Sequence, residues 1–178
     1  VDFDVHHGNG TQDIFANDPR VLMVGTFQHP FYPYCGIEDP APNMLNVPMP
    51  AGTRSDGFRQ AVTDVWLPAL RAFAPEAIFV SAGFDAHYED DMASLGLVEA
   101  DYAWVTRELK AVAAESAQGR IVSLLEGADA RTLGAAGKLV NEHEMGELFK
   151  VLGLARGLAL PAGEDWIGFA TGDRTHRL

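Results

Sequence analysis

The sequence predicts an α/β fold in which helices flank a parallel sheet. Short apolar runs, rich in β-branched and aromatic residues, alternate along the chain with longer segments of helical spacing, which is typical of strand–helix–strand units. Two of these runs are almost continuously apolar, as expected for strands buried on both faces of a parallel sheet. The chain has 178 residues, 47% of them hydrophobic, which is enough for one domain with its own core.

The predicted strands are residues 1–5, 21–27, 77–81 and 121–125. The given sequence begins inside the first of these strands. Its first residues lack the basic and apolar regions of a signal peptide. We therefore expect the natural start of the protein to lie upstream. Ligands are expected beyond the carboxyl ends of such strands.

Two helices are predicted between the strands. One begins at Ser55, a plausible N-cap, and runs to about Leu70, with Pro68 kinking or interrupting it. The other covers residues 98–117, where apolar residues recur at helical spacing, and Gly119 ends it.

The remaining segments differ from this pattern. Residues 28–54 are rich in proline and aromatic residues and predict a long loop, which is more often functional than accidental. After Gly127 the chain becomes rich in alanine, and Asn141 and Glu144 then form a capping-box pattern ahead of an apolar helical face. We therefore divide the chain into an α/β part, residues 1–126, and a helical C-terminal tail, residues 127–178.

Composition excludes several classes of function. The formal net charge of −12 argues against a nucleic-acid partner, because phosphate attraction requires a basic face. No apolar run approaches the length of a membrane span. The single cysteine, Cys35, excludes an internal disulfide, and a cytoplasmic setting is the expectation.

The first residues of the chain are candidate metal ligands. Along a strand, alternate side chains share a face, so Asp2, Asp4 and His6 are expected to point the same way. Two carboxylates and an imidazole on one face repel or lose solvation together unless a cation lies among them. Oxygen and nitrogen ligands of this kind suit zinc or another divalent first-row ion. The alternative is a solvated strand end with incidental acids.

A third acidic residue follows a different strand. Asp85 comes directly after the apolar strand at 77–81, at a position where a parallel sheet places its ligands. Taken alone, such a residue could equally be a helix cap. With Asp4 and His6 it completes three protein ligands and leaves one position open, which is the catalytic arrangement for zinc.

Four motifs share the order of a known family: Asp-x-Asp-x-His-His-Gly-Asn-Gly-Thr at 2–11, Phe-Tyr-Pro at 31–33, Asn-Val-Pro at 46–48 and Ser-Ala-Gly-Phe-Asp-Ala-His at 81–87. Together they resemble the zinc deacylases that include histone deacetylases, acetylpolyamine amidohydrolases and acetoin-utilisation proteins. Within this family, the asparagine at position 9 favours the class II-like bacterial branch. The resemblance spans residues 1–126 and implies part of an arginase/deacetylase-like parallel sheet with flanking helices.

The resemblance implies that Asp4, His6 and Asp85 are zinc ligands. Further residues are implied to support these ligands or a catalytic histidine through hydrogen bonds; they are Asp2, His7 and Asn9. For His7, packing in the core is an equally good interpretation.

Two more pairs are placed by the resemblance. Phe31 and Tyr32 are implied to line a narrow tunnel for an acyl-lysine-like or polyamine-like chain, with ordinary core packing as the alternative. Thr26 and Phe27, together with the backbone near the predicted ligands, match a structural monovalent-cation site. His29 and His87 are expected to be loop or surface histidines.

The implied reaction is zinc-assisted hydrolysis of an N-acyl amide, in which a histidine pair takes a proton from water and a tyrosine donates to the oxyanion. The histidine pair belongs to a segment upstream of Asp2. The tyrosine belongs to a Glu-Gly-Gly-Tyr motif, of which this chain keeps Glu126 and Gly127 but has Asp129 in place of the tyrosine. An ionised aspartate has no proton to donate, so we expect this chain to be inactive as it stands.

Other interpretations remain open at this stage. The tail, through residues 144–152 and 172–174, resembles the C-terminal end of a SAM-dependent methyltransferase family linked to complex I assembly, and a divergent native tail is the alternative. The chain could be a non-catalytic metal- or acyl-chain-binding module. It could also be an arginase-like binuclear manganese hydrolase, for which His87 and Asp90 match poorly. An exposed sheet edge predicts self-association.

Overall fold

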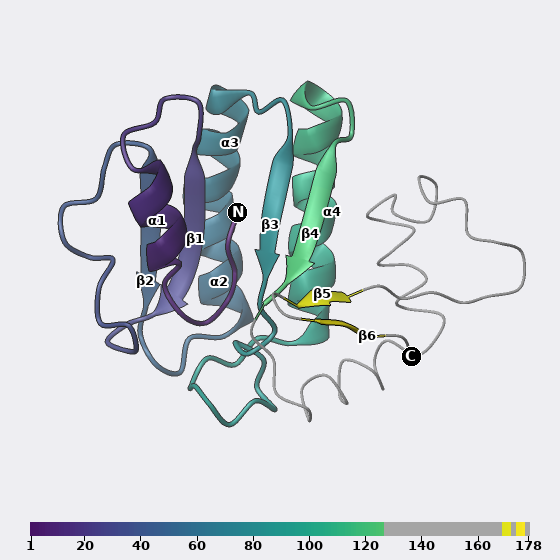
Figure 1. Cartoon of the computed structure of the whole chain (residues 1–178). Coiled ribbons are helices and arrows are strands. Elements are labelled where there is room, and N and C mark those ends of the chain that lie inside the picture. The colour runs from purple at the N-terminus through teal and green to yellow at the C-terminus, as the bar shows by residue number, and fades with distance from the viewer. Residues whose placement is uncertain (127–168, 172–173, 177–178) are drawn as a thin grey trace, which may run out of the picture.

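The computed structural model describes residues 1–126, 169–171 and 174–176 (Figure 1). The helix predicted after Asn141 lies outside the described residues. The described part of the tail is a pair of short antiparallel strands, β5 (Phe169–Thr171) and β6 (Arg174–His176).

The main sheet is parallel, as predicted. Its four strands are β1 (Met23–Gln28), β2 (Met44–Met49), β3 (Ile78–Ala82) and β4 (Ile121–Leu125). β1 pairs with β2, and β3 pairs with β4, both in parallel. Asp2 joins the two pairs through parallel bridges to Gly25 and Ser81. The order across the sheet is therefore β2, β1, the segment around Asp2, β3 and β4.

The strand predicted at residues 1–5 is much shorter than expected. Only Asp2 makes strand bridges, and the chain bends from Asp4 to His6. The carboxylates cause this bend, because Asp2 Oδ1 accepts the N–H of Asp4 at 3.0 Å and Asp4 Oδ1 accepts the N–H of His6 at 2.8 Å. Aspartate side chains commonly form such turns with the backbone two residues on.

The strands β5 and β6 were not predicted, because the tail was expected to be helical. Two further elements, in the first part of the chain, were also not predicted. The prediction of an unbroken loop at 28–54 is wrong, because this segment contains β2. β2 carries Pro48, which an edge strand tolerates since the missing N–H is not needed for pairing there. The other element is α1 (Asn9–Phe15), a short helix with no buried residue and therefore no apolar periodicity to reveal it.

The first predicted helix is divided into three parts: α2 (Ser55–Ala61), the π-helical turn η1 (Val62–Trp66) and α3 (Leu67–Phe73). The division falls just before Pro68, whose ring nitrogen cannot donate to the preceding turn. The predicted N-cap is wrong: the cap is Arg54, and Ser55 donates its hydroxyl to Asp101 at 2.7 Å. The second helix, α4 (Glu99–Ser116), matches the prediction closely.

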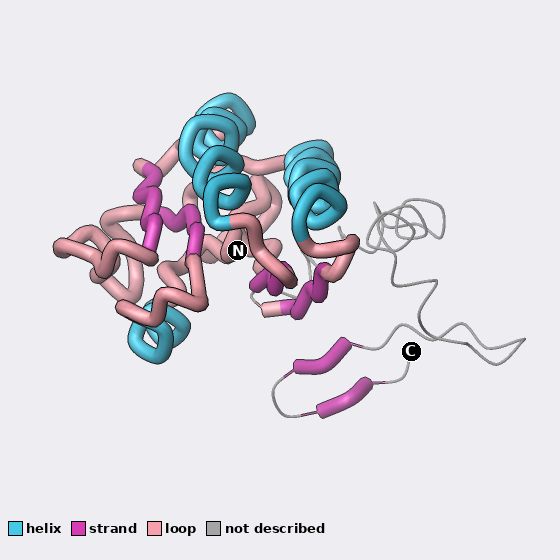
Figure 2. The backbone as a smooth tube through the Cα atoms, turned by 90° about the horizontal axis from the view of Figure 1, so that it is seen from above, coloured by secondary structure: helices cyan, strands magenta, loops and turns pink. Residues whose placement is uncertain are grey.

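The helices lie on both faces of the sheet. α2, α3 and α4 cover one face, and α1 lies on the other face over β1 (Figures 1 and 2). The core forms between the sheet and the three helices, with Trp66, Phe58 and Leu109 among its largest fully buried side chains. No helix of the described part is long and apolar enough to cross a membrane.

A buried acid connects two helices within this layer. Asp101 is fully buried near the start of α4, and its carboxylate accepts hydrogen bonds from Arg59 Nε at 2.7 Å, from Ser55 Oγ at 2.7 Å and from the N–H of Val98 at 2.9 Å. The carboxylate therefore holds the start of α2 against the start of α4.

Candidate metal centre

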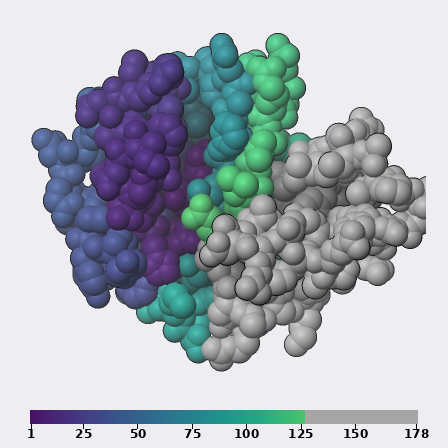
Figure 3. All heavy atoms as spheres, viewed as in Figure 1, coloured from purple at the N-terminus to yellow at the C-terminus, as the bar shows by residue number. Residues whose placement is uncertain are grey.

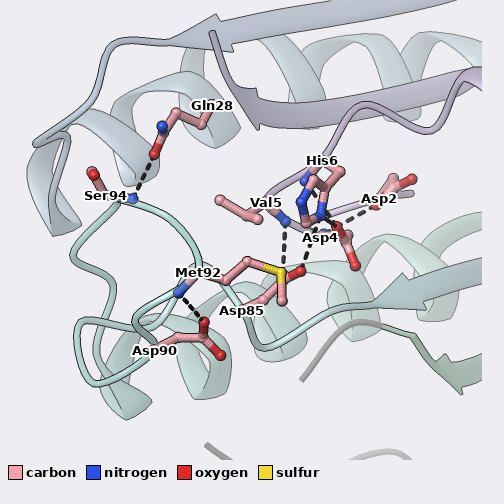
Figure 4. Close-up of polar contacts among 9 residues, drawn as sticks. All are labelled: Asp2, Asp4, Val5, His6, Gln28, Asp85, Asp90, Met92 and Ser94. Carbon is pink, nitrogen blue, oxygen red and sulfur yellow. Dashed lines mark hydrogen bonds and ion pairs between the residues drawn. The ribbon is translucent and has the colours of Figure 1, made fainter. Parts of the chain in front are cut away.

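Three side chains meet at the carboxyl edge of the sheet. Asp4 and His6 follow the bridging residue Asp2, and Asp85 follows the end of β3 (Figure 4). One potential ligand atom from each of Asp4, His6 and Asp85 lies within 4.8 Å of the others. The structure therefore brings the three predicted metal ligands together, although 80 residues of sequence separate Val5 from Asp85.

The geometry of the group is tight. His6 Nδ1 lies 2.9 Å from Asp4 Oδ1 and 3.2 Å from Asp85 Oδ2. The second oxygen of Asp85 accepts the N–H of Val5 at 2.9 Å. Both carboxylates are buried, whereas the His6 ring is partly exposed. The two carboxylates are therefore held within the protein, where Asp85 is bonded to the backbone of Val5. The His6 ring is the part of the group that solvent can reach.

The charges of the group explain why a cation suits it. Hydrogen bonds to Asp4, and then to Asp85, raise the pKa of His6 to about 10. Burial raises the pKa of Asp85, since the carboxylate loses solvation. Without another cation, a proton on His6 supplies the positive charge between the two acids. A divalent ion could replace that proton and coordinate the same three atoms.

The backbone around the group is closely packed. A Cβ added to Gly83, between β3 and Asp85, would lie 2.5 Å from the Asp4 Cα and would collide with the Asp4 side chain. Only glycine allows β3 and the segment around Asp4 to approach this closely. Gly83 belongs to the Ser81–His87 motif, but its steric role could not be inferred from the sequence.

The residues expected to support the ligands occupy different environments. Asp2 is buried, and burial raises the pKa of its carboxyl to about 7. His7 is also buried, with its ring centroid 4.7 Å from that of Phe27, and burial lowers its pKa. Asn9 lies exposed at the first position of α1, where its backbone N–H donates to the His7 carbonyl at 2.8 Å.

The two aromatic residues expected to line a tunnel lie against His6. The Phe31 ring stacks on the His6 ring, with centroids 5.3 Å apart and planes inclined by 27°. The Tyr32 ring meets it edge-on, with centroids 6.1 Å apart, and is exposed. Both rings therefore lie beside the partly exposed His6 ring of the candidate centre.

The residues of the suggested monovalent-cation site lie on β1. Thr26 and Phe27 are buried, and the N–H of Thr26 donates to the backbone carbonyl of Asp2 at 3.2 Å. These contacts place Thr26 beside Asp2, and a cation at this position stays a prediction.

His87 was expected to be a loop or surface histidine. It lies in the loop after Asp85, but its side chain is buried, and its ring lies close to the rings of Tyr88 and Tyr102. Its Nδ1 accepts the N–H of Glu89 at 3.2 Å, and its Nε2 lies 3.4 Å from a carboxylate oxygen of Glu99. The loop after Asp85 folds back to α4, which local sequence could not reveal.

The described residues contain one converging group of three or more potential ligands, formed by Asp4, His6 and Asp85. An arginase-like pair of manganese ions requires further bridging acids. The described part of the chain therefore offers ligands for one metal ion, with no second group around His87 and Asp90.

Comparison with known proteins places this chain and its fold in the deacetylase family. Residues 1–132 match the model of the histone deacetylase domain. A probable deacetylase of Archaeoglobus fulgidus is 39% identical over 133 residues, covering 71% of this chain and 37% of that protein. A histone deacetylase-like amidohydrolase of Pseudomonas aeruginosa is 37% identical over 134 residues, covering 71% of this chain and 35% of that protein.

Solved structures agree with this result. The HDA15 HD domain superposes with a TM-score of 0.70 and 31% identity, over 86% of this chain and 44% of that chain. An acetylpolyamine aminohydrolase of Burkholderia pseudomallei has a TM-score of 0.62 and 31% identity, over 71% of this chain and 38% of that one. The chain belongs to the histone deacetylase domain family, and it spans about a third of the length of the two relatives described above.

Proposed function

We propose that Asp4, His6 and Asp85 bind one zinc ion, and that this centre serves the hydrolysis of N-acyl amides in a complete domain of this family. The observation that carries the proposal is the convergence of two buried carboxylates and one imidazole at the carboxyl edge of the sheet. Two acids and a histidine form a donor set that zinc uses in catalytic sites.

A zinc ion bound here supplies a Lewis acid that polarises an acyl carbonyl and acidifies a water molecule. The residues of this chain hold that position in place. Asp85 is fixed by the N–H of Val5, and the bend at Asp4 is fixed by Asp2. Phe31 and Tyr32 present ring surfaces beside His6, which suits the methylene chain of an acylated lysine or polyamine.

The 178-residue chain supplies only part of the machinery implied by the family. Asp129 stands where the family resemblance implies a tyrosine, and an ionised aspartate has no proton to donate to an oxyanion. We therefore propose that this chain binds zinc and an acylated chain but does not turn a substrate over. Turnover then requires a proton donor that Asp129 does not supply.

Native mass spectrometry and competition with a coloured chelator test the zinc centre. We expect one zinc ion per chain, and Asp4→Asn and Asp85→Asn should each weaken zinc affinity by about 10-fold to 100-fold or more. Asp13→Asn, which removes an exposed acid from α1, is the matched control and should leave the affinity unchanged. Equal affinity for all four proteins would reject the centre.

Function is tested separately with an acetyl-lysine peptide. We expect the zinc-loaded chain to bind the peptide and to release no acetate. Release of acetate that is abolished by Asp85→Asn would show that the chain is active and that the proposed lack of turnover is wrong.

A further inference from the structure

The loop between β3 and α4 covers residues 83–98 and carries Asp85 near its start. It protrudes beyond the carboxyl edge of the sheet (Figure 1), and in the space-filling view it forms the teal lower end of the described chain (Figure 3). Asp85 lies inside a tight turn of this loop, because the N–H of His87 donates to the carbonyl of Phe84 at 3.1 Å. Whatever closes this turn therefore also sets the direction of the Asp85 carboxylate.

His87 makes further contacts that close the turn from its far side. Its Nδ1 accepts the N–H of Glu89 at 3.2 Å, and its carbonyl accepts the N–H of Asp90 at 3.0 Å. A neutral imidazole that accepts at Nδ1 carries its hydrogen on Nε2, and this atom lies 3.4 Å from Glu99 Oε1. His87 thus joins the turn, the residues that follow it and the first residue of α4.

The backbone around His87 is attached to the end of the loop as well. The N–H of Tyr88 donates to the carbonyl of Leu97 at 2.9 Å, and the N–H of Leu97 donates to the carbonyl of Ala86 at 3.1 Å. These bonds form the isolated parallel bridge between His87 and Leu97. The turn that presents Asp85 therefore rests against the residues that lead into α4.

The His87 ring is buried between this loop and α4. Its side chain is 5% exposed, and its ring stacks on the ring of Tyr102 in α4, with centroids 6.3 Å apart. The Tyr102 ring also packs against Phe84, with centroids 5.0 Å apart. A buried imidazole is costly unless its nitrogen atoms find partners, so the contacts of Nδ1 and Nε2 are needed to keep the ring in this place.

We propose that His87 is the positioning residue of Asp85. It holds the turn closed through Nδ1 and rests its ring on α4, so that the Asp85 carboxylate reaches the N–H of Val5 at 2.9 Å and the ring of His6 at 3.2 Å. Asp85 is then fixed by Val5 on one side and by His87 on the other. Metal ligands must keep their places within a fraction of an ångström. The consequence for zinc rests on the proposed function, whereas the placement of Asp85 does not.

Hydrogen exchange of the Val5 amide in the metal-free chain tests the placement directly, because Asp85 holds this N–H. His87→Leu keeps a side chain of similar size but offers no acceptor, and it should speed Val5 exchange by about tenfold or more relative to the amides of α4. His87→Asn keeps an acceptor near the place of Nδ1 and should restore most of the protection. Val112→Ala, a buried substitution near the other end of α4, is the matched control and should speed the exchange of Val5 and of the α4 amides together.

Zinc competition measures the second consequence. His87→Leu should weaken zinc affinity by about 10-fold to 100-fold and His87→Asn by less, while Val112→Ala should leave the affinity of the folded chain unchanged. Cobalt(II) bound in place of zinc reports the geometry of the ligands through its visible absorption spectrum. His87→Leu should alter this spectrum, and Val112→Ala should not.

The two readouts separate this inference from the proposed function. A chain that binds no zinc, yet loses Val5 protection in His87→Leu and regains it in His87→Asn, contradicts the proposed metal centre and supports the role of His87. Unchanged Val5 protection in His87→Leu overturns that role, and so does an unchanged zinc affinity in a chain that binds zinc. Equal losses in His87→Leu and His87→Asn overturn it as well.

Discussion

The backbone N–H of Val5 donates to Asp85 Oδ1 at 2.9 Å. This hydrogen bond joins the motif at residues 2–11 to the motif at residues 81–87. The other oxygen of Asp85 faces His6 Nδ1 at 3.2 Å. Asp85 therefore has two tasks: it positions the backbone that carries Asp4 and His6, and it offers a ligand atom to the same site. Substitutions near this contact should affect folding and metal binding together.

The close packing at Gly83 gives the first prediction. Gly83→Ala should destabilise the protein by about 1–3 kcal/mol, because the added methyl group forces Asp4 and its backbone away from β3. Zinc affinity should fall as well, since Asp4 is displaced. Gly10→Ala in α1 is the control, because nothing lies within 4 Å of the added atom, and it should be neutral or stabilising. Urea unfolding and zinc competition measure both effects, and a neutral Gly83→Ala would contradict the packing.

The metal-free protein should become less stable as the pH rises. Burial raises the pKa of Asp2 from 3.8 to about 7, so the stability supplied by its protonated form is present below pH 3.8 and is lost as the pH rises through 7. The two acids raise the pKa of His6 from 6.5 to about 10, so its contribution is complete below pH 6.5 and is lost as the pH rises through 10. Urea unfolding with a chelator present, compared at about pH 5 and about pH 9, measures the slope.

A variant separates these two contributions. Asp4→Asn removes the largest cause of the His6 shift and should flatten the decline above pH 7. A metal-free wild-type chain that gains stability between pH 5 and pH 9 would contradict the assignment.

The buried acid of α4 gives a prediction about stability alone. Asp101→Ala should destabilise the protein by about 1–3 kcal/mol, because the Ser55 hydroxyl, the Val98 N–H and the partly exposed Arg59 guanidinium lose their buried acceptor. Glu115→Ala breaks the exposed pair with Arg71 and should cost at most about 1 kcal/mol. Chemical denaturation compares the two, and similar effects would show that Asp101 does not connect α2 to α4.

Phe31 gives a prediction about ligand binding. Phe31→Leu should weaken binding of an acetyl-lysine peptide to the zinc-loaded chain by about 2-fold to 10-fold, as expected when an aromatic contact worth about 0.5–1.5 kcal/mol is lost. Tyr34→Leu replaces an exposed ring for which the described residues show no contact with His6. It should leave binding unchanged. Fluorescence anisotropy with a labelled peptide measures both, and equal losses would argue against a specific role of Phe31.

Sequence reasoning predicted the parts of the fold that carry periodic apolar patterns. β3, β4 and α4 fall within one or two residues of their predicted positions, because each buries a regular set of side chains. The parallel sheet and the family followed from the same patterns and motifs. α1 and β2 could not be predicted, since α1 buries nothing and β2 contains a proline.

The sequence predicted which residues form the candidate site, but it did not predict the backbone conformation that brings them together. Alternation along a strand suggested that Asp2, Asp4 and His6 share a face, but the backbone bends after Asp2, and Asp2 binds the Asp4 N–H instead of joining the ligand group. The role of Gly83 and the burial of His87 depend on contacts between distant segments. Such contacts leave no local signal in one sequence.

The joining of the sheet through Asp2 has a kinetic consequence. Asp4 and His6 are close in the chain, whereas Asp85 meets them only in the structure in which Asp2 pairs with Ser81 of β3. The complete set of ligands therefore exists only in the folded chain, so an ion binds tightly after the crossover has formed. If these contacts between distant segments form late in folding, zinc should leave the refolding rate nearly unchanged and slow the unfolding rate, which stopped-flow refolding and unfolding with and without zinc would measure.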